Sequence, residues 1–243
     1  MSRRMVIVSV MNCLILLSIA CSAFAQQAGQ GGANAAPAER RPPAAAPLFF
    51  REDWKPVAGL PTEHPVNQAA VANPNLELKL YGPASKDIQE NGAVNNEANP
   101  MHVWTGLCEG PCALTFRDKN NYVDLTGGAK IRWNIKVSGF HKVYPVIKLA
   151  DGTFLLGDHG DGTVTAYHPY EFSIGDVRWI KMDMNKVYTR GNLLDKVDLS
   201  KVDEVGFVDL IPGSGHGDGG YVDVGSVEVY GKPVKRDGAT SNQ

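Results

Sequence analysis

The sequence predicts an all-β fold, an antiparallel β-sandwich, on two observations. After the first 25 residues, no long apolar stripe recurs at helical spacing. Short runs instead alternate apolar and polar residues, and turn residues separate these runs at intervals of about ten positions. Alternation places successive side chains on opposite faces of a strand, so each run can bury one face and leave the other in water.

The alternating runs occupy 76–82, 130–137, 144–149, 153–157, 176–184, 204–210 and 221–231. In the run "KIRWNIKV" at 130–137, Trp133 and Ile135 alternate with Arg132 and Asn134. Asp151 and Gly152 separate two of the runs and form a hairpin turn signal. The predicted core residues are Trp133, Ile135, Val205, Phe207, Val227 and Val229.

The start of the chain has the pattern of a secretory signal peptide. Two arginines precede an apolar run, and "AFA" stands before Gln26 as a small-x-small cleavage site. Cleavage there predicts a secreted or periplasmic protein. A retained membrane anchor is less favoured because the run is short for a span. Lipid attachment at Cys21 is less favoured because Ser18 stands where a lipoprotein signal prefers leucine.

Composition divides the chain into a signal peptide at 1–25 and three further parts. Residues 26–47 are rich in Ala, Pro, Gly and Gln and have little to bury, which predicts a disordered tether. Residues 48–236 hold the alternating runs and are expected to form one β-sandwich domain. Residues 237–243 are expected to be a loose, disordered tail.

Removal of the signal peptide leaves two cysteines, Cys108 and Cys112 in "LCEGPC". In an oxidising compartment, such a pair is most simply a disulfide. The closed loop is so short that the bond would mainly hold local geometry. No Cys-x-x-Cys or Cys/His pattern accompanies the pair, which disfavours a redox or metal-binding role.

Residues 125–235 resemble the C-terminal half of the galactose-binding-like jelly roll found in carbohydrate-binding modules. The runs "VDLSKVDEVGFVDL" at 197–210 and "YVDVGSVEVYG" at 221–231 carry most of this resemblance. The same ending, with "GSGHG" between the runs, is similar to that of a group of exported bacterial proteins. The resemblance implies the jelly-roll fold but no activity, because such sandwiches host sugar binders, interaction domains and enzyme appendages.

The segment "GSGHGDGG" at 213–220 separates the last two runs. A phosphate cradle needs a helix after its glycines, whereas a strand is expected here, so the pattern excludes a nucleotide site. The simplest interpretation is a connection whose glycines supply positive φ. A second interpretation gives His216 and Asp218 a role in binding, because loops at one end of a sandwich often contact ligands.

A second polar loop, "GDHGDGTV", places Asp158 and Asp161 three positions apart. Carboxylates crowded on a tight turn suit Ca²⁺, although the full EF-hand pattern is absent. Galactose-binding-like domains often carry a structural Ca²⁺, so the resemblance raises this expectation. Calcium bound by Asp158 and Asp161 is therefore the candidate cofactor.

Polar side chains on the sheet faces form the candidate ligand site. The face of "KIRWNIKV" opposite Trp133 is unusually polar for a packed sheet. Cationic, amide and tyrosine side chains on one sheet would offer hydrogen bonds and a stacking face to a sugar, and arginine favours an acidic one. The alternative is an ordinary solvated outer face. The candidate residues are Arg132, Asn134, Tyr144, Lys148, Tyr167, His168, Arg178 and His216.

The sequence contains no recognisable catalytic motif. It has no G-x-S-x-G or H-E-x-x-H pattern, its histidines are scattered, and no spacing singles out a pair of carboxylates. The net charge of −2, without a basic run, argues against nucleic acid as a partner. The favoured function is a secreted, monomeric domain that binds a carbohydrate polymer without catalysis. A glycan-active hydrolase or lyase and an envelope structural or interaction module are the alternatives.

Overall fold

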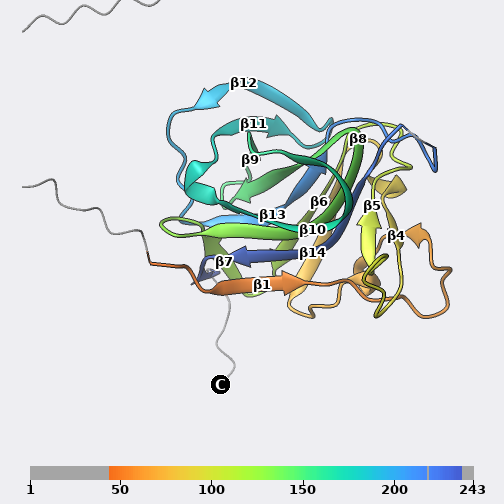
Figure 1. The fold of residues 1–243 in the computed structure, drawn as a ribbon. Coiled ribbons are helices and arrows are strands. Elements are labelled where there is room, and N and C mark those ends of the chain that lie inside the picture. Colours follow the sequence, from red (N-terminus) through yellow and green to blue (C-terminus); the bar gives the residue numbers. More distant parts are fainter. Residues whose placement is uncertain (1–43, 218, 237–243) are drawn as a thin grey trace, which may run out of the picture. The chain divides into compact units, whose positions relative to one another are not determined.

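The computed structural model describes residues 44–217 and 219–236, which form two antiparallel sheets joined by one shared strand (Figure 1). Sheet 1 contains β1 (Leu48–Glu52), β2 (His64–Pro65), β4 (Gln89–Asn91), β5 (His102–Trp104), β10 (Asp161–Ser173) and β14 (Val222–Tyr230). Sheet 2 contains β3 (Leu76–Tyr81), β6 (Cys112–Asp118), β7 (Asn121–Asp124), β9 (Phe154–Gly157), β11 (Trp179–Asp183), β12 (Tyr188–Leu194), β13 (Val202–Asp209) and β15 (Lys232–Lys235). Three 3-10 helices lie in the connections: η1 (Gln68–Ala70), η2 (Ser85–Asp87) and η3 (Ile174–Asp176).

The shared strand is β8 (Lys130–Leu149). Residues 130–137 of β8 pair with β10 and β14 in sheet 1, residues 142 and 143 pair with the start of β10, and residues 144–149 pair with β9 and β13 in sheet 2. The two runs at 130–137 and 144–149 are therefore halves of one strand. Between them, Gly139 has a φ of +64°, and a Cβ there would lie 2.5 Å from the carbonyl oxygen of Gly219. Only glycine adopts this backbone readily and leaves that space empty.

The two sheets pack face to face around one apolar core. Trp133 and Val227 from sheet 1 belong to the same buried cluster as Phe207 and Ile147 from sheet 2. The six predicted core residues are each at most 1% exposed. The predicted antiparallel β-sandwich is therefore confirmed, with the predicted faces of its strands turned inward.

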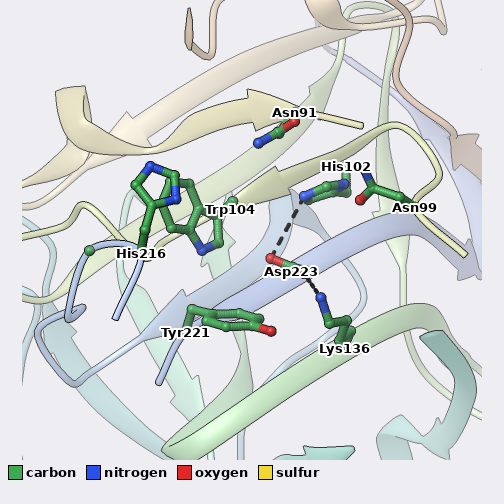
Figure 2. A pocket seen from close by; sticks show the side chains of 9 residues that line it. Asn91, Asn99, His102, Trp104, Lys136, His216, Tyr221 and Asp223 are labelled. Atoms are coloured by element: carbon green, nitrogen blue, oxygen red, sulfur yellow. Dashed lines mark ion pairs between the residues drawn. The ribbon is translucent and has the colours of Figure 1, made fainter. Parts of the chain in front are cut away.

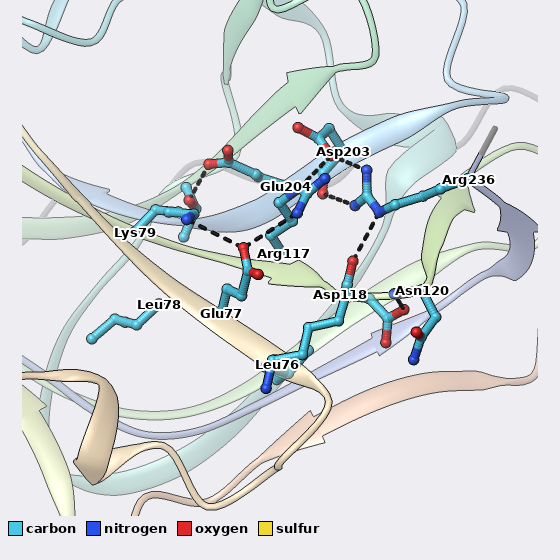
Figure 3. Close-up of polar contacts among 12 residues, drawn as sticks. Leu76, Glu77, Leu78, Lys79, Arg117, Asp118, Asn120, Asp203, Glu204 and Arg236 are labelled. Atoms are coloured by element: carbon cyan, nitrogen blue, oxygen red, sulfur yellow. Dashed lines mark hydrogen bonds and ion pairs between the residues drawn. The ribbon is translucent and has the colours of Figure 1, made fainter. Parts of the chain in front are cut away.

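A network of charged side chains joins β3, β6 and β13 to the end of β15 (Figure 3). Asp203 accepts hydrogen bonds from Arg117 at 3.1 Å and from Arg236 at 2.5 Å, and Arg117 also donates to Glu77 at 3.2 Å. Burial acts to raise the pKa of Asp203, but the two guanidinium groups outweigh it and hold this pKa below its ordinary value. The network attaches Arg236, the last described residue, to sheet 2.

Some of the expected divisions of the chain fall outside the described residues. The signal peptide expected at 1–25 and the tail expected at 237–243 are among these, as is most of the tether expected at 26–47. The last four tether residues are described, and Ala45 among them forms an isolated bridge with Gly128. Across the described parts of the chain, no helix is long and apolar enough to cross a membrane.

Candidate functional site

Cys108 and Cys112 form the predicted disulfide, which closes the loop between β5 and β6. The carbonyl oxygen of Cys108 accepts a hydrogen bond from the N–H of Gly213 at 2.7 Å. The carbonyl oxygen of Gly106 accepts one from Gly215, also at 2.7 Å. The disulfide loop therefore holds the start of the glycine-rich connection between β13 and β14.

The close approach of these two loops requires glycine. A Cβ at Gly213 would lie 2.2 Å from the carbonyl oxygen of Gly106. Ser214 then closes a small turn by donating to the carbonyl oxygens of Gly217 and Gly220. The glycine-rich segment is thus a connection between strands, as predicted, and it also carries His216 to the edge of a pocket. Asp218 lies outside the described residues.

This pocket, here called the Trp104 pocket, has a volume of about 210 Å³ (Figure 2). It is lined by Asn91, Asn99, His102, Trp104, Lys136, Gly215, His216, Tyr221 and Asp223. It lies on the outer face of sheet 1, because the neighbouring residues Val103, Val222 and Val224 point into the core.

Strand register brings the main residues of the pocket together. Asp223 on β14 pairs with Lys136 on β8 and with Trp104 on β5. On the next strand, Asn91 of β4 pairs with His102 of β5. Residues from four adjacent strands thus form two rows on one sheet face, so the rigid sheet positions them and loops only complete the rim.

Aromatic rings form one side of the pocket. The imidazole of His216 lies over the indole of Trp104, with ring centroids 4.7 Å apart. The His216 Nε2 atom is 3.3 Å from Glu63, and the imidazole is otherwise largely exposed. The ammonium of Lys136 lies 5.0 Å from the centroid of the Tyr221 ring. The pocket therefore combines flat apolar surfaces with hydrogen-bonding groups.

Asp223 and His102 form a buried pair at the base of the pocket. The Nδ1 atom of His102 lies 2.7 Å from the carbonyl oxygen of Pro100, which places the proton on Nδ1. The Nε2 atom of His102 is 3.7 Å from the Oδ1 atom of Asp223. Among the described residues, that Oδ1 atom has no hydrogen-bond partner. Burial raises the pKa of Asp223 and lowers the pKa of His102, and both shifts act against the charged forms.

Lys136 supplies the positive charge of the pocket. Its Nζ atom is 3.4 Å from Asp223. Burial acts to lower the pKa of Lys136, but interactions with Tyr221 and Asp223 outweigh burial and raise it. The pocket therefore holds a protonated amine beside the Oδ2 atom of Asp223, whereas the unpartnered Oδ1 atom is buried on the side of His102.

Two of the predicted ligand residues lie at this pocket. His216 lines it, and the hydroxyl of Tyr167 donates to Asp223 at 3.3 Å. Two others, Arg132 and Asn134, line a second pocket of about 250 Å³ on the same face of sheet 1. We call this the Arg132 pocket, and its lining residues are Arg51, Arg132, Trp133, Asn134, Pro169, Ser226 and Glu228.

The remaining predicted residues lie elsewhere. Tyr144 and Lys148 are on the half of β8 that belongs to sheet 2, and Lys148 donates to Glu204 at 2.8 Å. Arg178 precedes β11, also in sheet 2, and His168 is exposed on β10. The expectation that Arg132, Asn134, Tyr144, Lys148 and Arg178 share one surface is therefore wrong. Because β8 crosses between the sheets, its halves turn their polar faces to opposite sides of the sandwich.

Each of the two predicted calcium ligands has partners within the protein. Asp158 accepts hydrogen bonds from the backbone N–H of Arg178 at 2.8 Å and from its guanidinium at 2.7 Å. Asp161 accepts one from the indole of Trp133 at 2.8 Å and lies 3.1 Å from Nε2 of His159. No three His, Cys, Asp or Glu residues in the described ranges are grouped to hold a metal ion. Calcium binding at this loop stays a prediction.

Sequence reasoning missed most of the Trp104 pocket. Its strand residues follow the same alternating pattern as the core, but on the opposite face. In "HVW", His102 and Trp104 flank a buried valine, and in "YVD", Tyr221 and Asp223 do the same. The signal that could have identified these residues is an aromatic and a titratable residue on the same face of one strand. This signal does not show that the two strands are neighbours.

No protein-family model matches the sequence, and a search of curated proteins finds no match either. Among solved structures, this chain is similar to a family 11 carbohydrate-binding module from Clostridium thermocellum in complex with a β-1,3-1,4-mixed-linked tetrasaccharide. The two share 15% sequence identity with a TM-score of 0.42, and the match covers 72% of this chain and 98% of that chain. The carbohydrate recognition domain of Emp47p is 10% identical with a TM-score of 0.33, over 70% of this chain and 95% of that chain. An exo-β-agarase is 12% identical with a TM-score of 0.36, over 68% of this chain and 24% of that chain.

Proposed function

We propose that this domain binds carbohydrate in the Trp104 pocket and does not cleave it. One observation carries the proposal. The sheet register places Lys136, Asp223 and Trp104 in a row on one face, beside the side-chain amides of Asn91 and Asn99. These groups point into a pocket that is open to solvent on the outer face of the sandwich.

The chemistry of the lining suits a sugar ring. Hydroxyl groups need both donors and acceptors, and the ammonium of Lys136 and the side-chain amide of Asn99 supply both. The C–H face of a sugar packs on flat aromatic surfaces, which Tyr221 and the exposed imidazole of His216, backed by the buried Trp104, provide. A few convergent polar groups beside apolar surface are typical of a small-molecule site.

Isothermal titration calorimetry of the domain against neutral and acidic oligosaccharides tests this proposal, with and without EDTA. We expect binding that Trp104→Ala and Asn91→Ala each weaken by about tenfold or more. Tyr188→Ala, which removes an exposed aromatic ring on β12 of sheet 2, is a control for ring loss away from the pocket and should bind normally. Normal binding by Trp104→Ala would contradict the proposal. Sensitivity to EDTA would support the predicted calcium.

Asp223 favours a second candidate, a glycan-cleaving enzyme. Asp223 lines the pocket, and burial raises the pKa of its carboxyl group, as expected of a general acid. Glycosidases pair such an acid with a second carboxylate across the cleft, and the candidate is Glu63, which contacts the pocket residues His216 and Asn91. Release of reducing ends from a bound polysaccharide, abolished in Asp223→Asn, would establish the enzyme. Binding without release would leave the non-catalytic function.

We also propose that the protein is exported and acts as a monomer. The signal-peptide pattern and the cleavage site before Gln26 support export. The intact mass of the protein recovered from culture medium or periplasm tests both the cleavage site and lipid attachment at Cys21. Light scattering of the purified domain tests the monomer.

A further inference from the structure

We infer that the Trp104 pocket and the Arg132 pocket are two ends of one groove, which takes an acidic oligosaccharide with a carboxylate at Arg132. This inference rests on the proposed function and extends it to a ligand class and a second contact. Three features of the outer face of sheet 1 carry it.

The first feature is that two adjacent strands run through both pockets. On β8, Lys136 lines the Trp104 pocket, whereas Asn134 and Arg132 line the Arg132 pocket. Their partners on β14 are Asp223, Ser226 and Glu228, in that order. Lys136 lies four residue steps along the strand from Arg132, a distance of about 13 Å. This distance accommodates several linked sugar rings, so a single chain can reach both ends.

The second feature is the surface between the two pockets. Gly225 on β14 leaves this part of the face without a side chain of its own. A Cβ there would lie 3.5 Å from the Cε1 atom of Tyr167 and 3.6 Å from the Nδ2 atom of Asn134. The Tyr167 ring therefore lies over the sheet between the pockets, with its hydroxyl bound to Asp223. It offers a flat surface for the middle of a bound chain.

The third feature is the charge at the Arg132 end of the groove. Arg51 is already paired with Asp53 and Glu228. Glu228 also accepts a hydrogen bond from Tyr230 at 2.6 Å. By contrast, Arg132 is exposed and forms no ion pair with any described residue. A free guanidinium binds a carboxylate through two parallel hydrogen bonds, so this end of the groove selects an acidic sugar over a neutral one.

The test compares matched pairs of oligosaccharides that differ only in charge. The probes are oligogalacturonates and oligoglucuronates, short and long, each with its methyl ester, titrated calorimetrically at low and high salt. We expect the long acids to bind roughly tenfold more tightly than their esters. Arg132→Ala should remove this preference, and Arg132→Lys should restore only part of it. The short acids should show less preference because they do not reach both pockets.

Arg190→Ala is the matched control, since it removes the same charge from β12 of sheet 2. It should keep the preference. An undiminished acid preference in Arg132→Ala, or its loss in Arg190→Ala, overturns the inference. If acids and esters bind equally well, and Trp104→Ala weakens both, the inference is overturned but the proposed function stands. No binding of any probe by the parent protein, with normal thermal unfolding, overturns both.

Discussion

The imidazole of His216 lies over the indole of Trp104, with ring planes inclined by 36°. Trp104 is held in the sheet by β5, whereas His216 is on the glycine-rich connection. The contact depends on the hydrogen bonds that Gly213 and Gly215 donate to the disulfide loop. The Cys108–Cys112 disulfide does not line the pocket, but it supports the connection that positions His216 there.

Replacing both Cys108 and Cys112 by serine should therefore affect both stability and binding. The closed loop is short, so the loss in unfolding free energy should be about 2 kcal/mol. Saccharide affinity should fall as well, because the connection carrying His216 loses its fixed support. Urea denaturation and calorimetry measure the two effects. A lower stability with unchanged affinity would show that the disulfide does not position His216.

Phe207→Ala tests the predicted core. Phe207 on β13 is 1% exposed and packs between the two sheets. Truncation leaves a cavity that the surrounding strands cannot fill, so unfolding free energy should fall by about 3–5 kcal/mol. Urea denaturation checks this value. A change below 1 kcal/mol would contradict the burial of this side chain.

Arg236→Ala tests the network on sheet 2. Its guanidinium and the carboxylate of Asp203 are both largely buried, so the loss should be about 2 kcal/mol near neutral pH. The depressed pKa of Asp203 means that this carboxylate stabilises the fold above its unfolded pKa, and that the contribution disappears as pH falls through the folded pKa. The difference between variant and parent should therefore shrink in acid. Arg190→Ala, which breaks an exposed pair, should cost less than about 1 kcal/mol and serves as control.

Glu90→Gln tests a buried carboxyl group. Glu90 is fully buried, its Oε2 atom lies 3.0 Å from the Nε2 atom of His64, and Glu52 is a second titratable neighbour. Burial raises its pKa, and the attraction of His64 only partly opposes this shift. A raised folded pKa contributes stability below the unfolded value of about 4.3, and this contribution is lost as pH rises through the folded pKa.

The glutamine variant should therefore lose less stability than the parent as pH rises from about 4 to 7. It should be at least as stable as the parent at the upper end of this range. Denaturant unfolding at several pH values measures the slope. A parent whose stability rises more steeply than that of the variant would contradict the direction of the pKa shift.

The alternating runs predicted the strands and their buried faces well. Trp133, Phe207 and Val227 are buried because a period of two assigns each residue to one face before any partner strand is known. The disulfide was predictable because Cys108 and Cys112 are the two cysteines of the sequence that follow residue 25. The candidate site was predictable only in part, with His216 and Tyr167 at the Trp104 pocket and Arg132 and Asn134 at its neighbour.

The sequence by itself determined which residues point inward, because alternation is a local property of the strand. Only the tertiary structure decided which outward residues meet. Lys136 and Lys148 lie on the same strand, yet they project from opposite faces because β8 passes from one sheet to the other near Gly139. Conversely, Trp104 and Asp223 are distant in sequence and adjacent in the sheet. Which strands pair depends on how all the strands pack together around the core. The composition of a single strand therefore does not determine its neighbours.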